Sequence, residues 1–162
     1  MVIVRKHKRR TNKGLTRVKS HQRKVRKRGK YYHPKGQIII ENRPTESGYS
    51  QISEKRIKQI LDRVPKKDLG LIKRIKTKKI SGDRQGYVAL KKPREIVIGH
   101  RKKDEFIISD SMPMTLAHEI GHIASGHMTK ENLKRYNKQG GAYFNMENEA
   151  DNYARDIIFN KK

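Results

Sequence analysis

The chain has 162 residues, of which 33% are apolar and 35% charged, and its formal charge is +25. This length predicts one domain, and the low apolar content predicts that only part of the chain belongs to its core. The chain contains no cysteine, which excludes disulfides and thiolate metal ligands, so any metal site must use His, Asp or Glu. No run approaches the roughly 18 apolar residues of a membrane span and no secretory h-region is present, so the cytoplasm is the expected compartment.

Residues 1–36 form a basic arm with 15 Lys or Arg and no Asp or Glu. The arm has no sustained helical or strand periodicity, so we expect it to be extended or disordered up to the turn-forming Pro34 and Gly36. Such a charge is typical of segments that bind DNA or RNA, and Tyr31 and Tyr32 could stack on bases. A solubilising tail and a nuclear-type address are the alternatives. The residues expected to contact nucleic acid are Arg5, Lys6, Lys8, Arg9, Arg10, Arg23, Lys24, Arg26, Lys27 and Arg28.

A domain is expected over residues 37–162. It begins with a β-branched strand at 37–40, and Ser53 is the expected N-cap of a helix with one apolar face. Pro65 ends that helix or starts a further turn. Strands are then expected at 71–75, 87–90, 95–98 and 106–108, and helices at 114–125, 130–138 and 147–159, with a break at Gly140 and Gly141. A helix, several antiparallel strands and then helices indicate an α+β domain.

Residues 115–127 read TLAHEIGHIASGH. At 100° per residue, His118 and His122 project from one helix face, one turn apart, where both rings can reach a single metal ion. Glu119 lies beside the pair, which suits a carboxylate that contacts the metal's water without occupying a ligand position. Gly121 would leave the metal face uncrowded, at a cost in helix propensity. The alternative is an amphipathic helix with two solvent histidines.

Glu147 is the preferred third ligand. On the last expected helix it shares an inward face with Asp151 and two alanines, whereas Glu149 falls on the solvent side. Asp151 can accept a hydrogen bond from the outer ring nitrogen of a ligand histidine and so fix its tautomer. A continued helix would turn His127 away from the metal, so we expect a helix-end residue there. Two imidazoles, one carboxylate and an open position are typical of catalytic zinc, so Zn²⁺ is the expected cofactor.

Two motifs, TLAHEIGHIASGH and ENEADNYA, resemble those of the gluzincin branch of the zincin metallopeptidases, and within it the ImmA/IrrE family. The resemblance implies a zincin-like domain in which a small antiparallel or mixed sheet lies beside the catalytic helix. It is confined to residues 115–127 and 147–154 and gives the basic arm no counterpart. It implies metal ligands at His118, His122 and Glu147, a general base at Glu119, a second-motif residue at Asp151, and Tyr153 where the family usually has Phe.

The expected function is a zinc metallopeptidase that the basic arm brings to nucleic acid or to a nucleoprotein particle. Glu119 would take a proton from the attacking water and pass it to the leaving amine. One alternative is a non-enzymatic nucleic-acid-binding or particle-assembly protein built on the same fold. Another, by family analogy alone, is a regulatory peptidase that cleaves a DNA-bound repressor. The expected partners are a protein or peptide substrate and nucleic acid, without a membrane, and association with nucleoid, ribosome or virion stays open.

Two features of the expected active site are left open by the sequence. Tyr136, Tyr143 and His127 are the candidates for stabilising an oxyanion. The expected strands at 95–98 and 106–108 are the candidates for binding an extended substrate by β-augmentation.

Overall fold

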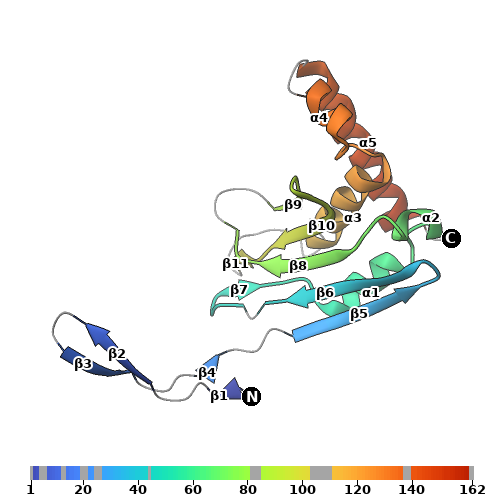
Figure 1. Ribbon diagram of the computed structural model, residues 1–162. Helices are drawn as coiled ribbons and strands as arrows, with labels where there is room; N and C mark the ends of the chain where they lie inside the picture. Colours follow the sequence, from blue (N-terminus) through green and yellow to red (C-terminus); the bar gives the residue numbers. More distant parts are fainter. Residues whose placement is uncertain are drawn as a thin grey trace.

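The backbone of the computed structural model is described for residues 2–3, 7–11, 14–18, 22–23, 27–43, 45–80, 85–102, 111–136 and 140–160, and the side chains for residues 29–43, 45–80, 85–101, 112–134 and 143–160. These residues form an α+β domain around a five-stranded sheet with the order β5-β6-β8-β10-β9 (Figure 1). The strands are β5 (Lys27–His33), β6 (Gly36–Asn42), β8 (Arg74–Lys78), β9 (Gly86–Ala89) and β10 (Lys92–Gly99).

The sheet is mixed rather than antiparallel. β8 pairs in parallel with β6 on one side and with β10 on the other, while β5 and β9 are antiparallel edge strands. Parallel neighbours need a long crossover connection, and the segment between β6 and β8 supplies one by passing through two helices. The sheet is thus the mixed one of the two arrangements that the resemblance implies, and the antiparallel pairing expected from the order of the elements is wrong for the three central strands.

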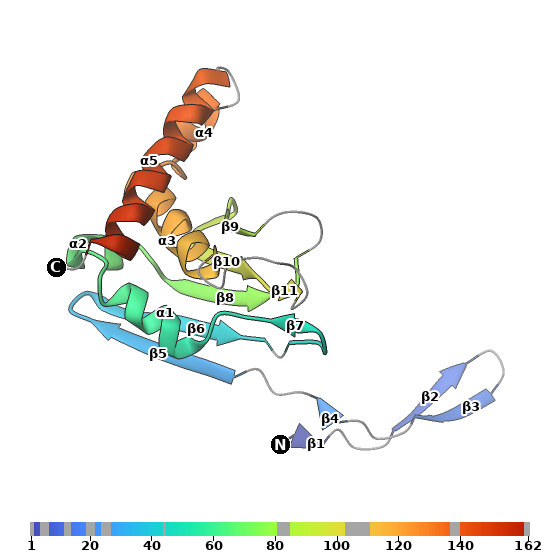
Figure 2. The ribbon, with the colours of Figure 1, turned by 180° about the vertical axis from the view of Figure 1, so that it is seen from behind.

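Two helices cover one face of the sheet. In Figures 1 and 2, seen from opposite sides, α1 and α3 lie on the same face of the strands, and α5 runs beside α3. Ser53 caps α1 as predicted, because its Oγ accepts a hydrogen bond from the backbone N–H of Arg56 at 3.1 Å. None of the described helices is long and apolar enough to cross a membrane. The helices are α1 (Glu54–Leu61), α2 (Lys66–Leu69), α3 (Ser111–Ala124), α4 (Lys130–Tyr136) and α5 (Gly140–Phe159).

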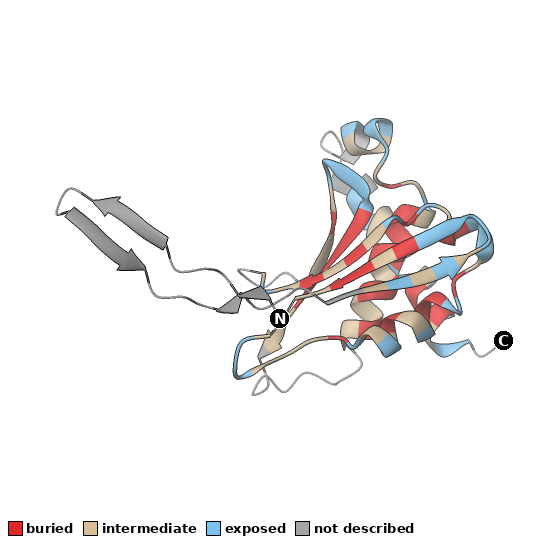
Figure 3. Cartoon of the chain, turned by 60° about the horizontal axis from the view of Figure 1, so that its bottom comes forward, coloured by how far each residue is buried: buried red, intermediate tan, exposed pale blue. Residues whose placement is uncertain are grey.

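The hydrophobic core lies between the sheet and these helices, where the buried residues in Figure 3 gather. Alternate residues of the strands point into it, as the period of two along a strand requires. The helices α1 and α3 add their apolar faces. Fully buried side chains include Ile38, Ile40, Ile75, Ile96 and Ile98 from the strands, and Ile57, Ile60, Leu61, Leu116 and Ile120 from the helices.

The sheet begins inside the segment that we expected to be the arm. β5 pairs with β6 over its whole length, so the sheet starts at Lys27 rather than at Gln37. Tyr31 packs against the core and its hydroxyl donates to Asp62 at 2.8 Å, which removes it from base stacking, whereas Tyr32 is 71% exposed. Before β5, β1 (Val2–Ile3) pairs with β4 (Gln22–Arg23), and β2 (His7–Thr11) pairs with β3 (Gly14–Val18), so the described part of the arm is extended.

Three other boundaries differ from the sequence-based expectation. The strand expected at 71–75 is β8 at Arg74–Lys78, and α3 begins at Ser111. α5 begins at Gly140, so Gly140 and Gly141 lie in its first turn instead of separating two helices. The backbone N–H groups of a first turn have no partner within the helix. The strand expected at 106–108 lies outside the described residues.

Candidate metal centre

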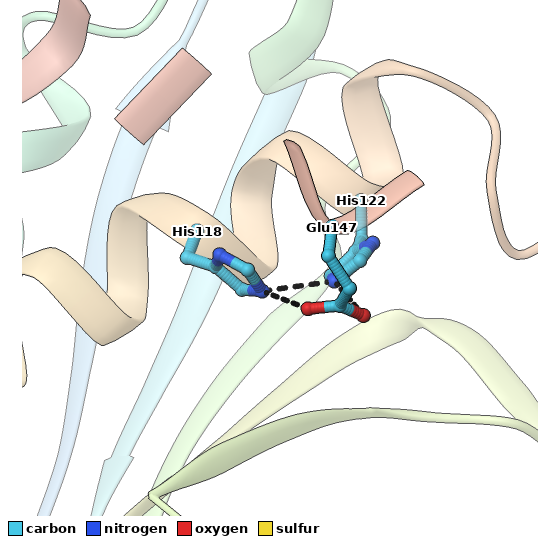
Figure 4. A group of neighbouring side chains, drawn as sticks. All are labelled: His118, His122 and Glu147. Carbon is cyan, nitrogen blue, oxygen red and sulfur yellow. Dashed lines mark hydrogen bonds and ion pairs between the residues drawn. The ribbon is translucent and has the colours of Figure 1, made fainter. Parts of the chain in front are cut away.

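Three side chains converge between two helices, with His118 and His122 on α3 and Glu147 on α5 (Figure 4). His118 Nε2 lies 3.0 Å from His122 Nε2 and 3.2 Å from Glu147 Oε2, and His122 Nε2 lies 3.5 Å from Glu147 Oε1. The ligand atoms of all three lie within 4.8 Å of one another, so the group could hold a metal ion. The structure thus brings together the three residues that the helical faces indicated, and places Glu149 elsewhere.

A close approach of α5 to α3 makes this convergence possible. A Cβ on Gly121 would lie 3.0 Å from both the Cα and the carbonyl oxygen of Ala150, and 3.2 Å from the Cβ of Tyr153. Gly121 therefore serves the packing of the two helices. Gly121 lies between His118 and His122 in α3, and Ala150 lies about one turn after Glu147 in α5, so this contact sets how closely the three side chains approach one another.

Asp151 lies where a support for the first histidine is needed. Its Oδ1 is 2.8 Å from His118 Nδ1, the ring nitrogen that faces away from Glu147. A carboxylate can only accept a hydrogen bond, so Nδ1 of His118 carries the proton and Nε2 presents its lone pair to the centre. Two imidazole nitrogens and a carboxylate oxygen are all atoms that ligate divalent transition metals in proteins, so the chemistry of these three side chains fits a metal ion.

Glu119 is buried beside this cluster of three side chains without being part of it. It is 8% exposed and lines a cavity of about 320 Å³ together with Gly86 of β9, Thr115 and His118 of α3, and Asp151 of α5. Burial, with a smaller contribution from the charge of Glu147, raises the pKa of Glu119 to about 7. The charge of His118 and a backbone hydrogen bond from Val88 act in the opposite direction.

His122 is in the form that a metal requires. Burial is the main cause that lowers its pKa, and the neighbouring His118 and His127 add to it, so the pKa falls to about 4. The ring is therefore neutral at physiological pH, and a neutral imidazole is the metal-binding form.

His127 and Glu149 lie behind the ligands in an arrangement that the sequence analysis missed. His127 is only 4% exposed and lies 2.9 Å, between Nδ1 atoms, from His122. Its Nε2 is 2.9 Å from Glu149 Oε2, whose side chain is on the solvent side of α5 as expected. The available signal was Gly126 followed by a histidine five residues after His122, a spacing typical of a helix end that folds back on itself.

Several predicted residues are not placed by the described side chains. Tyr136 has no described side chain, and Tyr143 is exposed on α5. Of the arm residues, Arg5, Lys6, Lys24 and Arg26 lie outside the described residues. Only the backbone is described for Lys8, Arg9, Arg10, Arg23, Lys27 and Arg28, all of which lie in strands.

Comparison with known proteins adds no family. No protein-family model, no curated protein and no solved structure matches this chain.

Proposed function

We propose that this chain is a zinc-dependent metallopeptidase with a zincin-like catalytic domain of the gluzincin type, resembling the ImmA/IrrE family. The observation that carries the proposal is the position of Glu119. It is a buried carboxyl group next to the His118–His122–Glu147 cluster, it lines the same cavity as His118, and it takes no part in that cluster. A site that only held a structural ion would not need such a group, whereas hydrolysis needs a base beside the metal.

Each residue then has a distinct task. His118, His122 and Glu147 would hold Zn²⁺, which supplies a Lewis acid and lowers the pKa of a bound water when present. Glu119 accepts the proton of the attacking water and delivers it to the leaving amine. In the metal-free chain burial raises the pKa of Glu119 to about 7, so its surroundings favour a carboxyl group that can take up a proton. Asp151 orients His118.

The substrate peptide would lie along β9. The strand at 95–98, one of two expected to bind substrate, belongs to β10 and is paired on both sides, by β8 and by β9. It has no free edge, so that expectation is wrong. Among the described residues β9 is the outermost strand on this side of the sheet, and Gln85 and Gly86 at its start line the cavity next to Glu119. An extended peptide added to β9 would bring its carbonyl groups past the base.

The arm would bring the peptidase to DNA or RNA. Residues 1–26, which precede the sheet, contain 11 Lys or Arg and no acidic residue. Such a high density of positive charge favours the phosphates of nucleic acid as the binding partner of this segment. If six of these charges met phosphates, the slope of log K against log salt would be about −5.

The decisive experiment replaces Glu119 with Gln and measures zinc content and peptide hydrolysis on the same preparations. The amide keeps the size of the side chain but cannot act as a base, so we expect about one zinc per chain in both proteins and a loss in rate of roughly 10² to 10⁴. Glu147→Ala is the matched control and should lose the zinc as well. Equal hydrolysis by Glu119→Gln and the unaltered chain would refute the mechanism. Zinc binding without hydrolysis of any protein in the bound nucleoprotein would favour the alternative, a non-enzymatic assembly protein on the same fold.

A further inference from the structure

His127 and Glu149 are two side chains near the candidate metal centre that the proposed mechanism does not use. They form a chain of hydrogen-bonding groups that runs from the buried ring of His122 to the surface. The contacts are 2.9 Å between the Nδ1 atoms of His122 and His127, and 2.9 Å between His127 Nε2 and Glu149 Oε2.

The turn after α3 creates the first of these contacts. Gly126 has φ +70°, its N–H donates to the carbonyl of Ile123 at 3.1 Å, and the N–H of His127 donates to the carbonyl of His122 at 3.0 Å. This pair of bonds is a Schellman motif, which brings together the side chains of the residues that are here His122 and His127. Asn132 holds the turn from outside, since its Nδ2 donates to the carbonyl of Gly126 at 2.9 Å. Where such turns usually bury two apolar side chains, this one pairs two imidazoles.

The positions of the protons follow from the last group in the chain. The carboxylate of Glu149 can only accept, so Nε2 of His127 carries a proton. When the ring of His127 is neutral it has one N–H and one bare nitrogen, so its Nδ1 is then bare and accepts from Nδ1–H of His122. That leaves Nε2 of His122 with a free lone pair, and it is this nitrogen that faces His118 and Glu147.

We propose that His127 and Glu149 are positioning residues that fix the tautomer and ring orientation of His122, as Asp151 does for His118. The inference rests on the proposed metal site. The inference also explains why His122 has two supporting residues whereas His118 has only Asp151. His122 is buried, and a carboxylate placed directly on its Nδ1 would also be buried, at a high desolvation cost. His127 carries the hydrogen bond outward to Glu149, whose side chain is 62% exposed, so the charge stays in water.

The first test reads the tautomer of His122 in the metal-free full chain by ¹⁵N NMR of the imidazole nitrogens. In the unaltered protein we expect the proton on Nδ1 and a bare Nε2. His127→Phe removes the acceptor, so the proton should redistribute between the two nitrogens. His127→Asn is the matched control, because its amide oxygen can take the place of the bare Nδ1 and should retain the original tautomer.

The second test measures zinc affinity by competition with a chelator. His127→Phe should weaken binding by about 10- to 100-fold, the usual effect of losing a group that orients a ligand, and His127→Asn should restore most of it. Glu149→Ala, at an exposed position where folding is not at risk, should weaken binding in the same direction, and Glu149→Gln should restore it because the amide oxygen still accepts.

The outcomes separate this inference from the proposed function. Unchanged zinc affinity together with an unchanged His122 tautomer in His127→Phe and Glu149→Ala would overturn the positioning role. A tautomer that depends on His127 in a chain that binds no zinc would support the positioning of His122 and refute the proposed metallopeptidase.

Discussion

Replacing Gly121 with Ala tests whether the packing of α5 on α3 sets the geometry of the metal centre. The new Cβ would lie 3.0 Å from the Cα and the carbonyl oxygen of Ala150. Carbon atoms pack best at about 3.5–4.0 Å, so the helices must separate by about half an ångström. Because both Ala150 atoms belong to the backbone, no change of rotamer relieves the contact, and α5 itself has to move.

Two opposing terms set the effect on stability. Ala is favoured over Gly inside a helix by about 1 kcal/mol, whereas overpacking a close contact costs about 1–3 kcal/mol. We therefore expect a net loss of about 0–2 kcal/mol in the free energy of unfolding. The effect on the metal is larger, because a shift of α5 moves Glu147 with it and metal–ligand distances tolerate only about 0.2 Å. Zinc affinity should fall by about tenfold or more, as when the support of a ligand is lost.

Urea unfolding of the metal-free protein and chelator competition measure the two effects separately. Glu147→Ala is the control, because it removes a ligand from a half-buried position without introducing a contact between the helices, so it should abolish zinc binding with little change in metal-free stability. Gly121→Ala would refute the reasoning if it raised the free energy of unfolding by the full gain in helix propensity and left zinc affinity unchanged, since the helices would then have room for the methyl group.

Three further outcomes are expected. Glu119 has a pKa of about 7 in the fold against an ordinary 4.5, so the unfolded chain releases this proton first and the metal-free fold loses stability as pH rises between these values. The free energy of unfolding of Glu119→Gln, relative to that of the unaltered chain, should therefore be about 3 kcal/mol higher at pH 8 than at pH 4. Urea midpoints of the two proteins that differ by the same amount at both pH values would contradict this. Tyr153→Phe removes the donor 2.9 Å from the buried Asp68 and should cost about 1–3 kcal/mol in urea unfolding, so no measurable loss would exclude a stabilising bond. Deleting residues 1–26 should leave the melting temperature of the domain unchanged and should flatten the salt dependence of DNA or RNA binding. Deleting residues 1–36 also removes β5 and should destabilise the domain. A salt slope that is the same with and without residues 1–26 would refute the tethering role of the arm.

The choice of Glu147 over Glu149 shows how far local periodicity reaches. Both residues lie on one helix, and the 100° step between residues places them on different faces before any partner is known. In the structure Glu147 lies at the two histidines and Glu149 on the solvent side of α5. The N-cap of α1 at Ser53 could also be predicted from the sequence, because the capping hydrogen bond joins residues only three positions apart.

The order of the strands in the sheet could not be predicted from the sequence in this way. Alternating apolar residues predict that a segment is a strand, but every strand with a buried face carries the same alternation. Which strands become neighbours depends on the crossover between β6 and β8 and on the edge position of β5, whose basic composition resembles that of the arm before it. β5 pairs with β6 along its whole length and so supplies the hydrogen-bond partner that the backbone of β6 needs on that side.

The sequence by itself determined which side chains each helix presents on one face. It therefore indicated the cluster of His118, His122 and Glu147 and the partner of His118, because a helical face depends on hydrogen bonds between residues a few positions apart. Only the tertiary structure decided that Gly121 lets α5 approach α3, that β9 borders the cavity, and that His127 meets Glu149. Each of these contacts joins segments that are separate in the chain, or a turn to a second helix. Their existence depends on how the whole core packs, which no local pattern of residues specifies.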